Sequence, residues 1–395
     1  MKYKLLFLTS HPSSVRSFIL PHARVLQKYY DIKILANTND NALIKRLGVN
    51  ISVNQANVLR SISILKDLKT LWSLYWNFKR NGLFSVHTIT PKAGLLGMLA
   101  AWLARVPLRI HSFTGQVWVT RNGLIRWFLK NIDKILGILA THTFADSHSQ
   151  LKFLIEQGIT NKKNCKVLAQ GSICGVNTNR FSPDLKIRKI VRRELKTKNN
   201  TLVCLYLGRL NKDKGVLDLA EAFVKVTKIK SNVELWIVGP DEENIYKEMR
   251  KKLKKALCQV KRVGFTAAPE NYMKAADLLC LPSYREGFGS TVIESAACSI
   301  PALVTNIYGL KDAVIEGKTG WTFESKNIQD LLDKLNLILS NPKELKIRGK
   351  AARIFVKKKF SEKKVTYAML NFYKNYIKKF DKKFFKNEIK FVQKH

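Results

Sequence analysis

Residues Glu286-Gly287-Phe288-Gly289-Ser290-Thr291-Val292-Ile293-Glu294 place two carboxylates on either side of a glycine turn. The apolar run Leu278–Leu281 precedes this stretch and predicts a short buried parallel strand. A loop to Gly289 follows, and Ser290 or Thr291 is then expected to cap a helix. The stretch therefore predicts one strand-loop-helix unit of an α/β sheet.

The two carboxylates are predicted to face one crevice. Glu286 falls at the carboxyl end of the strand and Glu294 in the first turns of the helix, at the edge where open α/β sheets bind ligands. Gly287 and Gly289 let the backbone approach an anion at the helix N-terminus. Carboxylates accept hydrogen bonds from sugar hydroxyls, while amides and cations hold phosphate. Carboxylates beside an anion site therefore suit a nucleotide sugar. On spacing alone, the commoner interpretation is that both glutamates lie at the solvent-exposed start of a helix. The surrounding residues favour a binding site instead.

A second strand-and-turn unit lies upstream. The apolar run Leu202–Leu207 predicts a strand, and Gly208-Arg209-Leu210-Asn211-Lys212-Asp213-Lys214-Gly215 follows it. Arg209 and Lys214 are thereby expected at another carboxyl end, where a guanidinium and an ammonium can bind a diphosphate.

With these motifs, the chain resembles the retaining glycosyltransferases of the GT-B fold, family GT4, whose donor signature is E-x7-E. The resemblance covers nearly the whole chain. It implies that Arg209 and Lys214 neutralise the leaving diphosphate, that Glu286 and the following amides hold the donor sugar, and that Glu294 holds the ribose. It also implies the donor-binding set Arg209, Lys214, Val263, Gly264, Glu286, Gly287, Phe288, Gly289, Ser290, Thr291 and Glu294, with the base resting at Val263 and Gly264.

Apolar strand candidates alternate with helical-period stretches along the whole chain, which predicts two doubly wound parallel sheets of Rossmann type facing a cleft. At 395 residues and 46% apolar content, two domains each bury a core. We expect an acceptor-binding domain at 1–185, a nucleotide-sugar domain at 200–360, and at 361–395 a helix returning to the first domain plus a basic tail. The polar stretch 182–200 is expected to be the linker.

The strand candidates of the first half are Leu5–Leu8, Ile32–Leu35, Leu83–His87, Leu108–Ser112, His142–Ala145 and Lys166–Leu168. Those of the second half are Leu202–Leu207, Glu234–Val238, Val260–Val263, Leu278–Leu281 and Pro301–Val304.

The acceptor site is expected in the first half. His111 ends the strand candidate Leu108–Ser112, and the resemblance implies that it lies beside the reacting carbon. Further acceptor-side candidates are Ser14, Arg16, His87 and Lys92. The loop Ser10–Arg16 departs from the family because it lacks the usual glycine. No metal-ligand spacing is present, so we expect neither a metal nor another cofactor.

The six cysteines are scattered, without a C-x-x-C pair, and several lie in apolar runs. This distribution predicts reduced core thiols and a cytoplasmic protein. The N-terminus is better interpreted as a first strand than as a signal peptide, and no segment reaches the ~20 apolar residues of a membrane span.

The formal net charge is +41, from 70 Lys and Arg against 29 Asp and Glu. Two stretches, 65–80 and 118–134, combine Trp72, Trp76, Trp118 and Trp127 with basic residues at helical spacing. They predict interfacial helices that hold the protein on the anionic inner face of the cytoplasmic membrane. Core helices with a basic outer face, or charge that reflects genome composition, are the alternatives.

The sequence thus predicts a hexosyltransferase that moves a hexose or N-acetylhexosamine from a nucleotide sugar, preferably a UDP-sugar, to a lipid-linked glycan. His87–Gly94 and Gly171–Asn177 are similar to the subset that builds bacterial surface oligosaccharides on polyprenyl diphosphate. A nucleotide-sugar epimerase on the same fold is one alternative. A charge-driven nucleic-acid-binding protein is another, although no nucleic-acid partner is expected.

Overall fold

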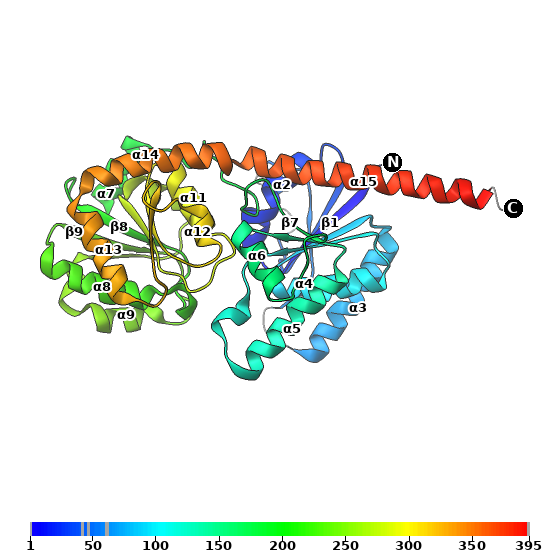
Figure 1. Cartoon of the computed structure of the whole chain (residues 1–395), viewed down its shortest axis with the longest axis horizontal. Helices are drawn as coiled ribbons and strands as arrows, with labels where there is room; N and C mark the ends of the chain where they lie inside the picture. The colour runs from blue at the N-terminus through cyan, green and yellow to red at the C-terminus, as the bar shows by residue number, and fades with distance from the viewer. Residues whose placement is uncertain (1, 41–42, 46–47, 60–62, 393–395) are drawn as a thin grey trace. The chain divides into compact units, whose positions relative to one another are not determined.

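The computed structural model describes residues 2–40, 43–45, 48–59 and 63–392, with side chains up to 382. It contains two parallel sheets (Figure 1). The first sheet has the order β3-β2-β1-β4-β5-β6-β7, and the second has the order β10-β9-β8-β11-β12-β13. All the strands run parallel, but the order in which the chain adds them reverses once in each sheet, between β1 and β4 and between β8 and β11, which defines the switch point of a doubly wound sheet.

The strands are β1 (Lys4–Thr9), β2 (Asp31–Ala36), β3 (Val53–Gln55), β4 (Ser85–Ile89), β5 (Leu108–Phe113), β6 (His142–Ala145), β7 (Cys165–Val167), β8 (Leu202–Leu207), β9 (Val233–Val238), β10 (Val260–Val263), β11 (Leu278–Leu281), β12 (Ala302–Thr305) and β13 (Gly320–Phe323).

The α-helices are α1 (Pro12–Ser14), α2 (Leu20–Leu26), α3 (Ile64–Asn81), α4 (Pro91–Leu103), α5 (Gly123–Leu139), α6 (His148–Glu156), α7 (Leu185–Glu194), α8 (Val216–Ile229), α9 (Ile245–Leu253), α10 (Pro269–Ala275), α11 (Ser290–Ala297), α12 (Leu310–Ala313), α13 (Ile328–Ser340), α14 (Pro342–Lys359) and α15 (Glu362–Val392). A π-turn η1 (Val15–Ile19) and the 3-10 turns η3 (Val117–Thr120), η4 (Lys212–Lys214) and η5 (Lys254–Gln259) complete the elements.

The predicted strands agree closely with the observed ones. Four of them, β6, β8, β10 and β11, have the predicted bounds, and the others are displaced by one or two residues. The sequence did not predict β3 and β13. Both are short edge strands: β3 exposes two of its three residues, and β13 begins with a glycine.

Contacts divide the chain into two units. The first comprises the residues up to 111, residues 139–141 and those from 362 onward, and the second comprises 112–138 and 142–361. The second unit has one continuous core built from β8 to β13 and the helices around them. Its buried strands are almost wholly apolar, as expected for parallel strands covered on both faces.

The core of the first unit is completed by the end of the chain. Tyr373 of α15 is fully buried, its ring lies 6.1 Å from that of Tyr30, and its hydroxyl lies 3.3 Å from Nδ1 of His87. Phe84 packs edge-on against Phe380, with ring centroids 5.1 Å apart. The last helix is therefore part of the first unit's hydrophobic core.

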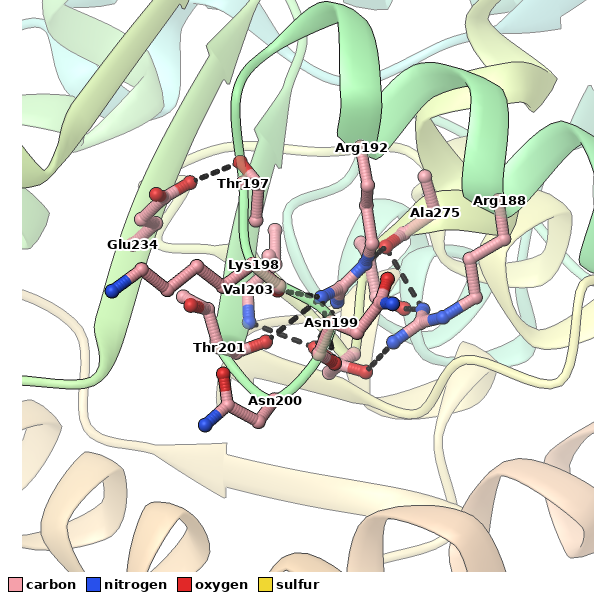
Figure 2. A network of polar contacts seen from close by, with 12 residues as sticks. Arg188, Arg192, Thr197, Lys198, Asn199, Asn200, Thr201, Val203, Glu234 and Ala275 are labelled. Carbon is pink, nitrogen blue, oxygen red and sulfur yellow. Dashed lines mark hydrogen bonds and ion pairs between the residues drawn. The ribbon is translucent and has the colours of Figure 1, made fainter.

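The expected linker 182–200 contains the helix α7. Arg192 of this helix is 1% exposed. Its guanidinium donates to the carbonyl oxygens of Ala275, Lys198 and Thr201 and pairs with Asp277 at 2.7 Å (Figure 2). Asp277 also accepts from Arg188 and from the N–H of Val203. This network ties α7 to the second sheet, and sequence reasoning missed it because a charged residue in a charged stretch suggests solvent.

The two aromatic, basic stretches form helices, with one correction. The exposed side of α3 carries Ile64, Leu65, Leu68, Trp72 and Trp76, which are between 38% and 82% exposed. On α5, Leu124, Ile125, Trp127 and Phe128 are exposed as well. Trp118, however, is buried in η3, where its Nε1 donates to Asp133 at 2.8 Å. It was predicted as an interfacial residue, but burial of its ring makes it a core residue.

Over the described residues, no helix combines the length and the apolar character needed to cross a bilayer. All six cysteines are free thiols, and five of them are buried, as predicted.

Candidate functional site

The loop between β11 and α11 begins the site. Gly289, not Ser290 or Thr291, is the N-cap of α11, and its φ of +76° lies in the left-handed region that favours glycine. The predicted side-chain cap is therefore wrong. Phe288 is buried and packs on Phe360 at 5.0 Å between ring centroids, so only its backbone remains for a ligand. Ser290 and Thr291 form the first turn of α11 and are partly exposed.

Lys214 and Glu286 form an ion pair, with Nζ 2.5 Å from Oε1. The hydroxyl of Ser283 donates to the same oxygen at 2.9 Å. Lys214 follows β8 and Glu286 follows β11, and these neighbouring strands flank the switch point of the second sheet. The structure thus brings together two predicted site residues that lie 72 positions apart in the sequence.

Arg209 lies next to this pair in the chain, directly after β8. Its Nη1 pairs with Oε2 of Glu242 at 2.8 Å, and its side chain is 44% exposed. The hydroxyl of Tyr206 donates to the carbonyl oxygen of Arg209 at 2.7 Å and fixes the backbone there. The guanidinium itself is held by a partly exposed pair, which a diphosphate can displace at low cost.

A glycine directly follows each of three adjacent strands. Gly208, Gly239 and Gly264 follow β8, β9 and β10, and the N–H of Gly239 donates to the carbonyl oxygens of Val263 and Gly264 at 3.2 and 3.1 Å. A Cβ on Gly264 would meet no other atom within 4 Å. The backbone at Val263 and Gly264 therefore borders open space, which is what a base-binding position requires.

Glu294 lies in the second turn of α11. Burial raises the pKa of its carboxyl group to about 7, the nearby Arg180 opposes the shift, and Glu270 adds to it. Arg180 pairs with Oε2 of Glu270 at 2.8 Å. Glu294 therefore titrates near neutral pH, which sequence spacing did not predict.

His111 belongs to the first unit and is 2% exposed. Its Nδ1 lies 2.8 Å from the Oγ1 of Thr88, and burial lowers the pKa of its imidazole to about 3. The ring is consequently neutral at physiological pH. The place of His111 beside a reacting carbon stays a prediction.

The other acceptor-side candidates also lie in the first unit. Burial lowers the pKa of His87 well below its usual value, and its contact with Tyr373 in the core argues against direct contact with an acceptor. Lys92 pairs with Asp67 at 2.7 Å. Ser14 is buried at the end of α1, and Arg16 is exposed in η1.

Several residues of the second unit escaped the sequence analysis. Arg285 binds Asp213 at 2.8 Å and Tyr284 donates to Asp218 at 2.6 Å, which joins the loops after β8 and β11 again. Asp146, at the end of β6, approaches the backbone at Gly287. The position of Asp146 at a strand's carboxyl end was the only signal in the sequence. Across the part of the chain that the structure describes, no group of three or more His, Cys, Asp or Glu side chains suits a metal ion.

Comparisons with known proteins agree with this geometry. Residues 187–355 match the family model "Glycosyl transferases group 1". The capsular polysaccharide biosynthesis glycosyltransferase CapM of Staphylococcus aureus is 28% identical over 320 residues, which cover 81% of this chain and 84% of CapM. The UDP-Gal:alpha-D-GlcNAc-diphosphoundecaprenol alpha-1,3-galactosyltransferase of Escherichia coli is 27% identical over 303 residues, or 74% and 76% of the two chains.

Among solved structures, HepE of Anabaena in complex with UDP and glucose matches with a TM-score of 0.79 at 18% identity, covering 94% of this chain and 100% of that one. The chain is similar to the group 1 glycosyltransferases, family GT4, and has the GT-B fold. The predicted family, fold class and enzyme class are confirmed. Enzymes of this group generally act without a metal.

Proposed function

We propose that this glycosyltransferase moves a hexose or N-acetylhexosamine from a UDP-sugar to a glycan on polyprenyl diphosphate, with retention of configuration. The E. coli relative is named for transfer from UDP-Gal to a diphosphoundecaprenol-linked sugar, and CapM is named for capsular polysaccharide biosynthesis. Both relatives are covered over about three quarters of their length or more. In this proposal, residues 1–185 bind the acceptor, 200–360 bind the donor, and 361–395 return to the first domain.

The observation that carries the proposal is the Lys214–Glu286 pair at the switch point of the second sheet. An ammonium and a carboxylate held together provide one group for phosphate oxygens and one for sugar hydroxyls. Arg209 supplies a second cation, and the N–H groups that open α11 add positive potential. Together they stabilise the negative charge that develops on the departing diphosphate.

The acceptor proposal includes docking on an anionic membrane surface. On α3, the exposed apolar residues alternate with Lys66, Lys69, Lys79 and Arg80, and the guanidinium of Arg80 lies 5.4 Å from the ring centroid of Trp76. Large exposed apolar groups flanked by cations suit the boundary between acyl chains and headgroups. A lipid-linked acceptor would then be reached from the cytoplasmic face without a membrane span.

The test is a screen of nucleotide sugars for release of nucleoside diphosphate, with and without vesicles that carry a polyprenyl-diphosphate-linked sugar. We expect release from one UDP-sugar, stimulated by the lipid acceptor. Interconversion of sugars without release of UDP would indicate an epimerase and overturn the proposal. If UDP were released at the same rate with and without every lipid-linked acceptor, the proposed acceptor class would be overturned and the proposed donor class would stand.

A further inference from the structure

Asp146 lies between β6 and α6 and is only 6% exposed. Its backbone is satisfied, because its N–H donates to Oε1 of Gln150 at 2.7 Å and its carbonyl oxygen accepts from the N–H of Ser172 at 2.6 Å. Its carboxyl group is not: within the described residues, no side chain or amide forms a hydrogen bond or ion pair with it. A buried polar group without a partner is costly, so its retention calls for an explanation.

Glycine backbone lies close to this carboxyl group. A Cβ on Gly287 would lie 2.9 Å from Oδ2 of Asp146. A Cβ on Gly115 would lie 3.0 Å from the nitrogen of Gly287, and one on Gly171 would lie 2.9 Å from the carbonyl oxygen of Asp146. Gly287 and Gly171 therefore approach Asp146 closely, and Gly115 packs against Gly287. The carboxyl group borders the turn that carries Glu286.

The loop that carries Asp146 is also fixed in place. The hydroxyl of Ser147 caps α6 by accepting from the N–H of Gln150 at 3.0 Å. Ser149 accepts from the N–H of Gly309 at 2.7 Å and donates its own N–H to Asp312 at 2.8 Å. These bonds join the loop after β6 to the loop after β12. The position of the carboxyl group beside Gly287 is therefore set by backbone contacts on both sides.

We propose that Asp146 is a third acidic residue of the sugar-binding site, and that its carboxyl group bonds a hydroxyl of the donor's glycosyl group beside Glu286. The inference rests on the proposed function, since it takes the ligand at Glu286 to be a nucleotide sugar. A carboxyl group suits a hydroxyl in either protonation state: the ionised form accepts, and the neutral form both donates and accepts. Burial raises the pKa of Asp146 to about 8, so the neutral form predominates at pH 7.

Calorimetry with UDP and with the UDP-hexose chosen by the donor screen tests the assignment. The Asp146→Ala variant should bind the UDP-hexose about tenfold more weakly, the loss typical of one hydrogen bond, and should bind UDP as the wild type does. If the variant lost affinity equally for both ligands, or for neither, the proposed role of Asp146 would be overturned and the proposed function would stand. A wild type that binds no UDP would overturn the proposed function, and the assignment with it.

A second measurement needs no ligand. The pKa of Asp146 is about 8 in the folded state and near 4 when unfolded, so its contribution to stability is complete below about pH 4 and is lost as the pH rises through 8. The ionisable groups on adjoining segments are His148, Glu286 and Asp312, and none of these three bonds the carboxyl group. Asp146→Asn keeps the shape and cannot ionise.

The melting temperature of Asp146→Asn should therefore exceed that of the wild type by a margin that grows from pH 6 to pH 9. The matched control is Asp312→Asn, which weakens a formed bond to Ser149 and should lower the melting temperature. A margin that stayed constant from pH 6 to pH 9 would mean that the carboxyl group ionises as readily in the folded protein as in the unfolded one, and the inference would fail.

Discussion

The ammonium of Lys214 lies 2.5 Å from Oε1 of Glu286, and each side chain is 17% exposed. The two residues come from loops after neighbouring strands, and no other motif in the sequence links them. Because the pair is largely shielded from water, removing one member leaves the other partly buried without its counter-charge. Substitutions at the two positions should consequently be non-additive.

Replacing Arg209 or Lys214 with alanine should each lower turnover about a hundredfold or more. Each cation is proposed to contact charge that develops on the leaving diphosphate, and loss of one such contact costs about 3 kcal/mol. Steady-state release of the nucleoside diphosphate measures the effect. Lys212→Ala is the matched control, because Lys212 lies in the same turn with an exposed side chain. Normal turnover in both test variants would remove the diphosphate role.

The Glu286→Gln variant should fold normally and lose donor affinity and activity. The amide keeps the shape of the side chain but weakens its hydrogen bonds to sugar hydroxyls, which are worth about 1.5–3 kcal/mol each when charge-assisted. It also removes the counter-charge of Lys214. Calorimetry of donor binding and a thermal melt separate the two effects. Unchanged binding and unchanged rates would show Glu286 to be structural.

Donor binding should weaken as the pH falls through 7. Burial raises the pKa of Glu294 to about 7, so the carboxylate expected to accept bonds from ribose hydroxyls is largely protonated at pH 6 and ionised at pH 8. The affinity for UDP, measured from pH 5.5 to 8.5, should show this step in the wild type. Glu294→Gln should show a flat profile, and a step that survives in that variant would belong to another group.

The Arg192→Met variant should be destabilised by about 3 kcal/mol or more. It removes a buried guanidinium and leaves Asp277 and four carbonyl oxygens with fewer donors. Denaturant unfolding measures the change in free energy. Arg193→Met is the control, because Arg193 is exposed on the same helix and its loss should cost less than about 0.5 kcal/mol. Equal stability of the two variants would contradict the anchoring role of Arg192.

Binding to vesicles should require anionic lipid and fall markedly between ~0.1 M and ~1 M salt, where the screening length drops from ~10 Å to ~3 Å. The double variant Trp72→Ser, Trp76→Ser should reduce sedimentation with these vesicles, because it removes exposed aromatic anchors from α3. Ile354→Ser, at an exposed apolar position on α14, is the control. Equal binding to neutral vesicles, or none to either kind, would refute docking through charge.

The order of strands and helices was predictable because buried parallel strands appear as short apolar runs, as in Leu202–Leu207 and Leu278–Leu281. The missed elements have weaker signals. Val53–Gln55 has a single buried residue, and α7 is mostly charged, although one of its charged residues, Arg192, is buried and donates hydrogen bonds to neighbouring segments. Local hydrophobic patterns carry no information about such long-range polar contacts.

The candidate donor residues stand out in the sequence because most of them are grouped in two short segments. The pairing of Lys214 with Glu286 depends on the sheet order, which places β8 beside β11 and which no local pattern encodes. Asp146 was missed for a different reason. Its carboxyl group is notable for the absence of a partner, and an absence becomes visible only when the surrounding chain has been folded around it.

The burial of Tyr373 in the core of the first unit has a consequence for biosynthesis. The strands of that unit leave the ribosome early, but the helix that completes their core is encoded at the end of the chain. At about 5–20 residues per second, the nascent first unit waits tens of seconds for α15, with the surface that receives Tyr373 uncovered. Ribosome-bound chains that stop before residue 362 should therefore recruit chaperones and resist proteolysis poorly in their first unit.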